Sequence, residues 1–274
     1  MPVESVVLRV LSLGAGVQSS ALALMAEHGE IPRPDYAIFS DTQSEPEHVY
    51  HWLNWLEGQL SYPVIRVSAG SLRQELLDAC DGIRGAWGRP PFFIRNANGS
   101  IGMTNRQCTQ DYKIDPIMRK VRELAGIKPR SRGPREIAVE QIIGISFDEL
   151  HRMKPARFRW VANSYPLVEK RIRRLQCIEW MHKNGYPTPP KSACTFCTYH
   201  SDAMWGEIKR NDPKSWSDIV YLDGRIRTGS HHLLKGTPYL HRTCRPIDEI
   251  DFDTAEDHGQ VDLFGNECEG MCGL

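Results

Sequence analysis

The sequence has no net charge, because its 34 lysine and arginine residues are balanced by 34 aspartate and glutamate residues. A protein without a positive excess is not an electrostatic nucleic-acid binder as a whole, so any such contact needs a local patch. No apolar run approaches the ~20 residues of a membrane-spanning helix. There is also no internal repeat and no low-complexity segment, and the composition is typical of a globular protein.

A secretory signal is also missing, because the first apolar stretch is short, contains Arg9 and continues directly into a glycine-containing turn. We therefore expect a cytoplasmic protein with no membrane partner. In that compartment the eight cysteines are expected to be thiols, metal ligands or redox groups, and static disulfides are not expected. The 274 residues suit one large domain, or one domain with an appendage. The sequence does not indicate an oligomeric state.

The most informative stretch is residues 12–20, SLGAGVQSS, which lies between two apolar runs. The run at 6–11 is typical of a short buried strand. The run at 21–26 is typical of a helix that Gly29 ends. The sequence therefore predicts a strand, a glycine-rich turn and a helix N-terminus in succession.

This turn has the residue types of an anion site. Gly14 and Gly16 allow a tight turn and a close approach of the backbone to a ligand. Ser19 and Ser20 bring hydroxyl groups beside the unpaired N–H groups of the first helical turn, where phosphate or sulfate binds readily. A strand–helix turn that simply requires small residues is the alternative.

A second predicted strand, at 35–40, ends at Asp41 and Thr42. Ligands of open α/β sheets bind at the carboxyl ends of the strands, so Asp41 is a candidate contact for a ribose or for a metal ion on phosphates. Its alternative role is to cap the following helix. Further strands and helices alternate along the chain, with a strand at 63–67 and helices at 48–60 and 72–79. This alternation predicts a parallel sheet with helices on both faces.

A later strand, at 138–145, also ends in polar residues. Gly144 is followed by Asp148, Glu149 and Arg152, as the switch point of an α/β sheet would require. Lys113 lies beside a helix predicted over 114–125. These strand-end and helix-end groups are candidates for the same site as the glycine-rich turn.

Five further segments carry expectations of their own. Residues 81–106 lose periodicity and predict a long binding loop. Residues 168–183 predict one continuous helix. The basic stretches 128–135 and 152–159 are solvated segments or contacts for a polyanion such as nucleic acid. The tail from 228 to 274 shows little periodicity.

Two cysteines, Cys194 and Cys197, form a C-x-x-C turn that could hold one metal or cluster. Cys108 and Cys177 are the natural partners for a four-thiolate site. Such a site holds a 4Fe–4S cluster or zinc, and the alternative is a redox pair that binds nothing. In the tail, Cys268 and Cys272 could swing into a basic pocket as nucleophiles, or could form a second metal clip.

The motifs together resemble the PP-loop superfamily and its phosphoadenosine phosphosulfate (PAPS) reductase-like branch. The resemblance covers residues 5–222 and depends on the order and spacing of several segments. These are residues 12–20, 39–42, 108–116, 144–152 and 194–197.

The chain departs from the family pattern at three places. Gln18 stands where an acidic residue is usual before the last serine of the loop. Thr109 follows Cys108 where the family has a second cysteine, so Cys177 is the candidate for the missing ligand. The Glu-Cys-Gly end of the reductases is split here between residues 267–268 and 272–274.

The resemblance implies an α/β fold with a parallel five-stranded, Rossmann-like sheet and a cysteine-rich C-terminal extension. It implies a PP-loop domain over 1–160, a helical cysteine-containing region over 161–227 and an irregular tail over 228–274. The implied catalytic residues are Cys272, Cys268, Arg152 and Lys113, and the implied metal ligands are Cys108, Cys177, Cys194 and Cys197. The implied nucleotide contacts are Ser12, Gly14, Gly16, Gln18, Ser19, Ser20, Asp41, Thr42, Gly144 and Asp148.

Three functions remain open from the sequence. The first is an enzyme that reduces a sulfonucleotide, PAPS or adenylyl sulfate (APS), with a thiol reductant and a 4Fe–4S cluster. The second is an ATP-dependent sulfurtransferase that acts on RNA or DNA through the local basic stretches. The third is a nucleotide- or metal-binding module without activity, for which Gln18 is the main support.

Overall fold

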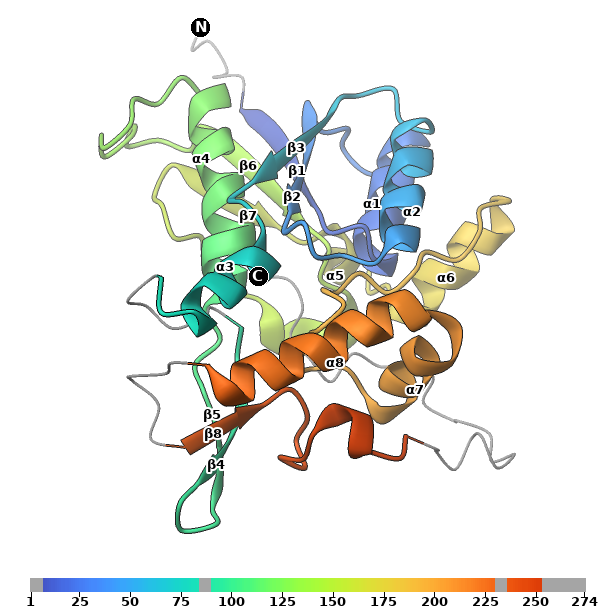
Figure 1. The fold of residues 1–274 in the computed structure, drawn as a ribbon. Helices are drawn as coiled ribbons and strands as arrows, with labels where there is room; N and C mark the ends of the chain where they lie inside the picture. The colour runs from blue at the N-terminus through green and yellow to red at the C-terminus, as the bar shows by residue number, and fades with distance from the viewer. Residues whose placement is uncertain (1–6, 84–89, 230–235, 253–274) are drawn as a thin grey trace, which may run out of the picture.

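The computed structural model describes residues 7–83, 90–229 and 236–252. Five strands form an all-parallel sheet in the order β3-β2-β1-β6-β7, so the predicted α/β class and five-stranded parallel sheet are confirmed (Figure 1). The strands are β1 (Leu8–Leu13), β2 (Tyr36–Asp41), β3 (Val64–Ser68), β6 (Val139–Ile143) and β7 (Val161–Ser164).

The order of the strands reverses at β1. Val10 of β1 is opposite Tyr36 of β2 on one side, and Leu8 is opposite Val139 of β6 on the other. The chain therefore leaves β1 and β6 in opposite directions across the sheet. A crevice opens outside the carboxyl ends of the strands at such a point, which is where α/β sheets bind ligands.

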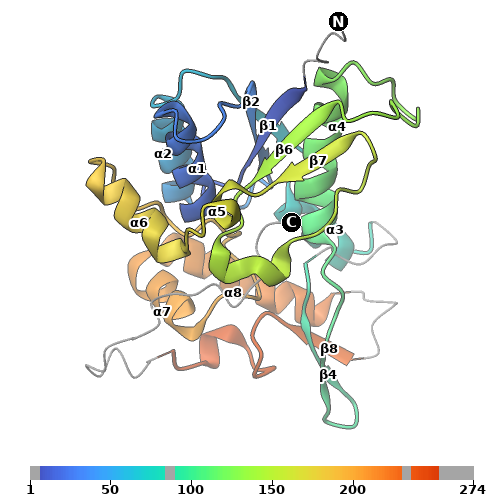
Figure 2. The same cartoon turned by 180° about the vertical axis from the view of Figure 1, so that it is seen from behind.

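Helices cover both faces of the sheet (Figures 1 and 2). The face with α1 (Val17–Glu27), α2 (Glu47–Glu57) and α6 (Arg174–Lys183) encloses one buried core. The buried residues of α2 are Val49, Trp52, Leu53 and Leu56. The opposite face packs against α4 (Asp115–Leu124) and forms a second core.

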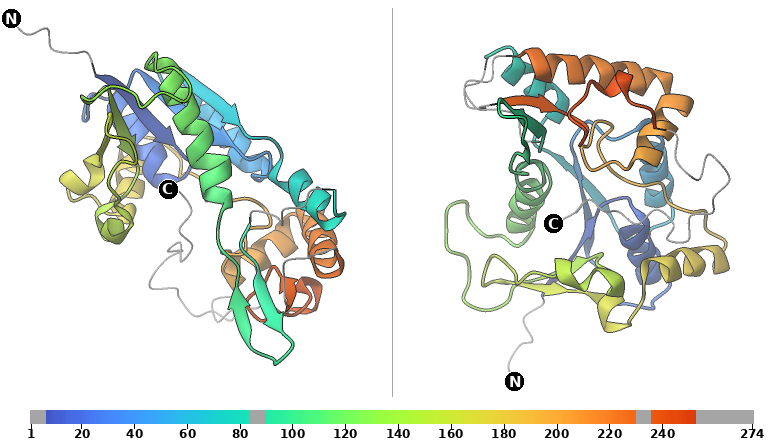
Figure 3. Two further views of the ribbon diagram at one scale, coloured as in Figure 1. Left: turned by 90° about the vertical axis from the view of Figure 1, so that its left-hand side faces the viewer. Right: turned by 90° about the horizontal axis from the view of Figure 1, so that it is seen from below.

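A second lobe lies beyond the carboxyl ends of the parallel strands, as the orange and red segments in Figure 3 show. It contains α3 (Leu72–Cys80), α7 (Asp202–Asn211) and α8 (Pro213–Thr228). An antiparallel sheet of order β5-β4-β8 completes it, with β4 at Phe93–Asn96, β5 at Ile101–Met103 and β8 at Gly236–Tyr239. The lobe has its own buried core, so the strand ends are covered and any site there is partly enclosed.

Short helices complete the connections. They are the π-helix η1 (Gln110–Ile114), the 3₁₀ helix η2 (Phe147–Arg152), the single turn α5 (Pro166–Glu169) and the 3₁₀ helix η3 (Ile247–Glu249). Within the described ranges, none of the helices has both the length and the apolar character needed to cross a membrane.

The loop expected over 81–106 is in part a β-hairpin. Its strand β4 pairs with β5 across a short turn, and also with β8, where Phe93 is opposite Tyr239. Because β8 comes about 140 residues later in the chain, no local sequence pattern could indicate this pairing.

The helix expected over 168–183 is interrupted. Arg171 has a positive φ of 55°, and the carbonyl of Ile172 accepts a backbone hydrogen bond from Phe147 at 2.8 Å. This contact with η2 holds the chain in a turn between α5 and α6. Tertiary contacts therefore override the helical periodicity of the segment.

The domain boundary expected at residue 160 falls one strand before the end of the parallel sheet. β7 begins at Val161 and pairs with β6, where Val139 is opposite Val161. The second lobe also takes α3 and β4 from the N-terminal half of the chain. The two lobes are therefore interleaved in sequence, because the connection after β3 contributes to both.

Asp223 of α8 joins three elements of the second lobe. Its side chain is fully buried. One carboxylate oxygen accepts a hydrogen bond from the backbone N–H of Leu240 at 3.1 Å. The other accepts from Ile247 N–H and from Arg227 Nε, both at 3.1 Å. Loss of water around the carboxyl group raises the pKa of Asp223 despite these donors.

We expect Asp223→Asn to lower the free energy of unfolding by about 2–4 kcal/mol, because the new NH₂ group cannot accept hydrogen bonds from Ile247 and Arg227. The raised pKa adds a pH dependence. As the pH rises above the ordinary Asp value of 3.8, the unfolded chain releases its proton first, so the wild-type protein loses stability over that range. The free energy of unfolding, measured with urea, should therefore differ more between wild type and variant near pH 4 than at pH 7. A difference that grows with pH contradicts this assignment.

Candidate functional site

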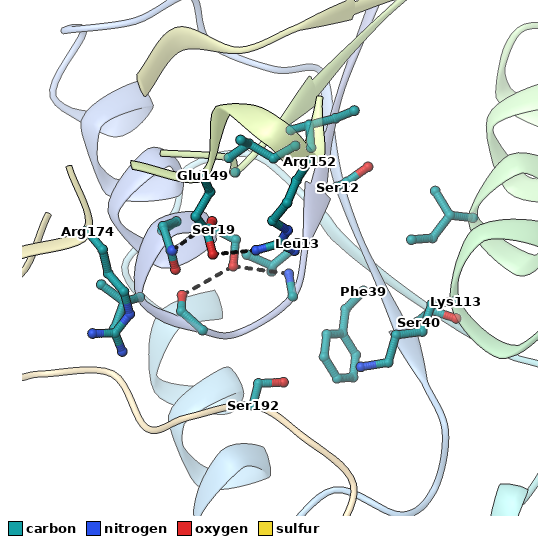
Figure 4. Close-up of a pocket in the computed structure, with 18 of the residues that line it drawn as sticks. Ser12, Leu13, Ser19, Phe39, Ser40, Lys113, Glu149, Arg152, Arg174 and Ser192 are labelled. Atoms are coloured by element: carbon teal, nitrogen blue, oxygen red, sulfur yellow. Dashed lines mark hydrogen bonds and ion pairs between the residues drawn. The ribbon is translucent and has the colours of Figure 1, made fainter. Parts of the chain in front are cut away.

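A cavity of about 150 Å³ lies at the carboxyl ends of β1, β2 and β6 (Figure 4). It collects residues from both sides of the reversal in strand order. The lining includes the loop residues Ser12, Leu13, Gly14, Gly16, Val17, Gln18 and Ser19, and the strand-end residues Phe39, Ser40, Ile143, Gly144 and Ile145. The predicted glycine-rich turn therefore forms one wall of an enclosed site.

Ser19 holds the loop in shape. Its hydroxyl accepts a hydrogen bond from the backbone N–H of Gly14 at 3.1 Å and donates one to the carbonyl of Gly16 at 3.2 Å. Ala15, between the two glycines, is fully buried and has a φ of 56°, a conformation that costs a residue with a Cβ about 1–3 kcal/mol. The surrounding contacts thus impose a strained turn, which is common at binding sites.

The N-terminus of α1 is open toward the cavity. Gly16 is its N-cap residue and has no side-chain cap. The first turn contains no acidic residue, and Val17 and Gln18 line the cavity. Unsatisfied N–H groups and the helix dipole together favour an anion at this position.

Gly144 lies against the start of α1. A Cβ placed there would be 3.0 Å from the backbone nitrogen of Ser19 and 3.1 Å from its Cα. Those are backbone atoms, so the neighbour cannot move aside as a flexible side chain would. Glycine at this strand end is therefore required for the close approach of β6 to the glycine-rich turn after β1.

Gln18 is connected to the opposite wall through Glu149. Its Nε2 donates to Glu149 Oε2 at 3.1 Å, and the other oxygen of Glu149 forms an ion pair with Arg152. The two charged side chains are only 16% and 11% exposed. Glu149 thus brings a carboxylate to the loop at which Gln18 replaces the acidic residue of the family pattern.

Four cationic residues line the cavity. Figure 4 labels three of them, Lys113 from η1, Arg152 from η2 and Arg174 from α6. The fourth is Lys191, in the segment between α6 and α7. A π-helical turn such as η1 often accompanies a functional residue, because it shifts the following side chains around the helix axis. The convergence of these cations on a helix N-terminus favours a multiply charged anion.

Lys113 is held by a buried carboxylate. Glu45 has a side chain that is only 1% exposed, and its two oxygens contact Lys113 Nζ at 3.3 Å and the hydroxyl of Ser192 at 3.1 Å. Lys113 and Ser192 both line the cavity. Glu45 therefore positions two polar groups of the cavity without lining it.

Four of the predicted nucleotide contacts lie outside the cavity lining. Ser20 is buried in the core, where its hydroxyl accepts from Trp52 Nε1 at 3.0 Å. Asp41 accepts from the Tyr50 hydroxyl at 2.8 Å and from the N–H of Gln43 at 2.7 Å, so it closes the turn after β2. Asp148 caps α6 through Arg174 N–H, and Thr42 is discussed with the cysteines below. The β2 residues in the cavity are instead Phe39 and Ser40.

A small cavity, of about 40 Å³, is lined by three of the predicted metal-ligand cysteines, Cys108, Cys194 and Cys197. Lys113 lines both this cavity and the first one. Burial raises the pKa of Cys194 to about 12, and its sulfur lies 3.3 Å from the hydroxyl of Thr42. Cys194 is therefore a neutral thiol in this environment at neutral pH.

His200 fixes the turn that holds two of these thiols. Burial lowers its pKa to about 4, so its ring is neutral. Nε2–H donates to the carbonyl oxygens of Cys194 at 3.0 Å and Thr195 at 3.2 Å. The ring also contacts Trp205 edge-on. Only its position six residues after Cys194 could have indicated this role in the sequence.

Cys177 lies elsewhere. It is fully buried in α6, within the core that α1 and α2 share, whereas Cys108 and Cys194 pack against the core of the second lobe. Burial raises the pKa of Cys177 to about 12. The structure thus brings together three of the four predicted ligands, and Cys268 and Cys272 lie outside the described residues.

Several residues of the first cavity were not among the predicted site residues. They include Phe39, Ser40, Arg174, Lys191 and Ser192. Glu149, which the sequence already indicated as a strand-end group, also lines the cavity. Arg174 begins α6 and Lys191 lies between α6 and α7, and only the fold brings both of them to the loop.

No protein-family model matches the chain, and no curated protein matches it. Among solved structures, it is similar to a phosphoadenylyl-sulfate (PAPS) reductase from Candida auris in a phosphate complex. That match has 10% identity, covers 68% of this chain and 81% of the reductase, and has a TM-score of 0.43. The chain is also similar to the U34-tRNA thiolase NcsA from Methanococcus maripaludis with its 4Fe–4S cluster. Here the identity is 14%, the coverage is 94% and 83%, and the TM-score is 0.34.

Neither likeness is close enough to indicate the reaction of this chain. The architecture is instead defined by the molecule's own features. The parallel strands follow the order β3-β2-β1-β6-β7, the glycine–serine loop follows β1, and Arg152 comes shortly after β6. By strand order and loop placement, the chain is an α/β protein with a glycine–serine loop at the switch point of a five-stranded parallel sheet.

Proposed function

We propose that the cavity at the end of β1 binds an adenine nucleotide through its phosphate or sulfate groups. The observation that carries this proposal is the uncapped N-terminus of α1, which faces a cavity lined by Lys113, Arg152 and Arg174. Phe39, Ile117 and Ile143 supply apolar walls for the base. An enclosed site with a few convergent polar groups is typical of a small-molecule pocket.

The reaction that we propose is the reduction of a sulfonucleotide, PAPS or APS. A cysteine thiolate attacks the sulfur of the sulfonate group, and a new S–S bond forms as the bond from sulfur to the bridging oxygen breaks. The nucleotide leaves with that oxygen, and a thiol reductant then releases sulfite as the two thiols become a disulfide. Arg152 and Lys113, which both line the cavity, would stabilise the negative charge of the leaving oxygen. Cys268 and Cys272 are the candidate nucleophiles.

ATP-dependent sulfur transfer is the second candidate function. Glu149 favours it, because this carboxylate lines the cavity next to Gln18 and is a suitable oxygen ligand for a Mg²⁺ ion on a triphosphate. In that reaction ATP activates an oxygen of the acceptor, and sulfur replaces the activated group. The acceptor would be a nucleic acid that contacts the basic stretches at 128–135 and 152–159.

A 4Fe–4S cluster or zinc is a further part of the proposal, and the cysteines fit it only in part. Thiols are the appropriate donors for either group. Within the three described ranges, however, no three cysteine, histidine, aspartate or glutamate side chains are arranged to hold one metal ion. Cys108, Cys194 and Cys197 share a cavity without converging on a point. No reaction step is therefore assigned to a cluster.

Metal analysis of cysteine variants tests which thiols matter. We expect iron or zinc bound after anaerobic purification to be lost in Cys194→Ala and Cys197→Ala, because both residues line the small cavity. Cys177→Ala should retain the metal, since Cys177 belongs to a different core. The readouts are iron, sulfide and zinc per chain and the visible absorption band. If Cys177→Ala loses the metal while it remains folded, the four-cysteine site predicted from the sequence is the correct one.

The proposed reaction is tested by incubating the purified protein with PAPS or APS and a thiol donor under anaerobic conditions. Sulfite and the free nucleotide are expected in equal amounts. Pyrophosphate release from ATP that depends on RNA or DNA would instead support sulfur transfer. Tight nucleotide binding without either product would contradict both reactions and leave a binding module.

A further inference from the structure

A further cavity of about 200 Å³ lies directly beside the nucleotide cavity. The two cavities share Ile143, Ile145 and Arg152 in their walls. The other walls of this second cavity come from η1, α4, β6, β7 and the segment that follows η2. A ligand in it would therefore lie across Arg152 from a ligand at the glycine-rich loop.

The interior of the second cavity suits a flat ring. Ile114, Met118 and Val161 provide apolar surface, and Phe158 and Tyr165 provide aromatic rings. A cavity of about 150 Å³ is enough for a benzene molecule. The second cavity, of about 200 Å³, therefore has room for one heteroaromatic base.

Three amide side chains give this apolar interior a hydrogen-bonding edge. Gln110, Gln141 and Asn163 all line the cavity. Each uses its amide nitrogen within the protein: Gln110 donates to Asp115, Gln141 to Ser12 Oγ at 2.8 Å, and Asn163 to the carbonyl of Lys154 at 3.0 Å. The amide oxygen of each side chain is an acceptor suited to the amino group of a base, and Gln110 and Gln141 each keep a second amide N–H as a donor.

The outer part of the cavity is cationic. Lys154 and Arg157 line it and are exposed to solvent. Arg157 pairs with Asp115 at 3.3 Å, but its side chain is 63% exposed, so the pair contributes little stability and can be exchanged for a phosphate. The basic stretch at 152–159 thus supplies the wall and the outer cations of one cavity.

From this arrangement we infer that the second cavity binds one nucleotide unit, with its base inside and its phosphate at Lys154 and Arg157. The inference rests on the proposal that the neighbouring cavity holds a first nucleotide by its phosphates. Bases are recognised by stacking on aromatic rings and by hydrogen bonds to their edges, and phosphates by lysine and arginine. The unit comes either from a free mononucleotide or from an unpaired base of a nucleic-acid strand.

The test measures binding while the first cavity is filled. The wild-type protein is saturated with a non-hydrolysable ATP analogue and titrated with cytidine 5′-monophosphate and, separately, with a six-residue single-stranded oligocytidylate. Both probes carry the amino group that the amide oxygens can accept. We expect at least one probe to bind with the analogue in place. The double variant Lys154→Glu/Arg157→Glu should weaken that binding at least about tenfold through charge repulsion.

The control is Lys170→Glu, which changes the same kind of exposed charge at a residue that lines neither cavity. It should leave the affinity within about twofold of wild type. Tighter binding of the mononucleotide assigns the site to a free nucleotide, and tighter binding of the oligonucleotide assigns it to a strand; either result supports the cavity assignment. The assignment is overturned if the analogue blocks both probes, if the double variant binds as wild type does, or if the control loses as much affinity.

Failure of this inference is distinguishable from failure of the proposed function. If neither the ATP analogue nor PAPS binds, the proposed nucleotide site is wrong. The probes can then be titrated into the wild type, the double variant and the control without any analogue present. The comparison of the double variant with the control still decides whether the second cavity binds a nucleotide unit.

Discussion

Arg152→Ala is expected to lower the rate of the nucleotide-dependent reaction about 100- to 1000-fold, which is the usual effect of removing one preorganised charge from a reacting group. The side chain of Arg152 is only 11% exposed and forms an ion pair with Glu149. It lines the cavity opposite the N-terminus of α1. Because its charge is most useful when negative charge develops, the loss should fall on kcat more than on KM. The measurement is the initial rate of sulfite release at saturating sulfonucleotide.

Arg159→Ala is the matched control for this variant. Arg159 follows on the same segment, is exposed, and donates to the carbonyl oxygens of Gly133 and Pro134, away from the cavity. Its replacement should leave the rate within about threefold of wild type. A rate for Arg152→Ala that is equally close to wild type would show that Arg152 does not contact the reacting groups.

Gly144→Ala is expected to weaken nucleotide binding at least about tenfold, equivalent to about 1.4 kcal/mol. The added methyl group would lie 3.0 Å from the backbone nitrogen of Ser19, so the end of β6 and the start of α1 must separate. The separation displaces the N–H groups that face the phosphate. It should also cost about 1–3 kcal/mol in unfolding free energy, as overpacking usually does. Calorimetric titration and thermal unfolding measure the two effects.

Gly224→Ala provides the comparison. Gly224 lies within α8, and a Cβ there meets no atom within 4 Å. Alanine at that position should raise stability by about 0.5–1 kcal/mol and leave nucleotide affinity unchanged. If Gly144→Ala binds nucleotide as tightly as Gly224→Ala does, the contact between β6 and the loop is not needed for binding.

The sequence was sufficient for the parallel sheet and the loop because those features depend on local pattern. The apolar run before residue 12 predicts a strand and the glycines at 14 and 16 predict a turn, although the residue of that turn with a positive φ is Ala15. Gly144 could be placed for the same reason, since it lies at the end of a predicted strand. The sequence could not predict that Gly144 lies against Ser19, because this contact joins two segments that are 125 residues apart.

The features that the sequence could not specify all depend on long-range contacts. The pairing of β4 with β8 and the turn at Arg171 follow from partners far along the chain. Ser20 illustrates the limit for the site itself. The sequence places a hydroxyl at the start of a helix but does not show which side of the helix it faces. Only the hydrogen bond from Trp52 shows that the Ser20 hydroxyl faces the core. Cys177 shows the same limit, because only the fold reveals that its helix packs on a different core from the one that Cys108 and Cys194 contact.

The central claim is that the open N-terminus of α1 binds the phosphates of an adenine nucleotide. Hydrogen–deuterium exchange of the peptide that spans residues 14–20 tests it most directly, with ATP and PAPS as ligands and adenosine as the control without phosphate. The account predicts slower exchange in this peptide with both phosphorylated ligands, and little change with adenosine, because the N–H groups at the start of α1 donate to the phosphate. Unchanged exchange in this peptide at saturating nucleotide, with protection only in other parts of the chain, would contradict the claim.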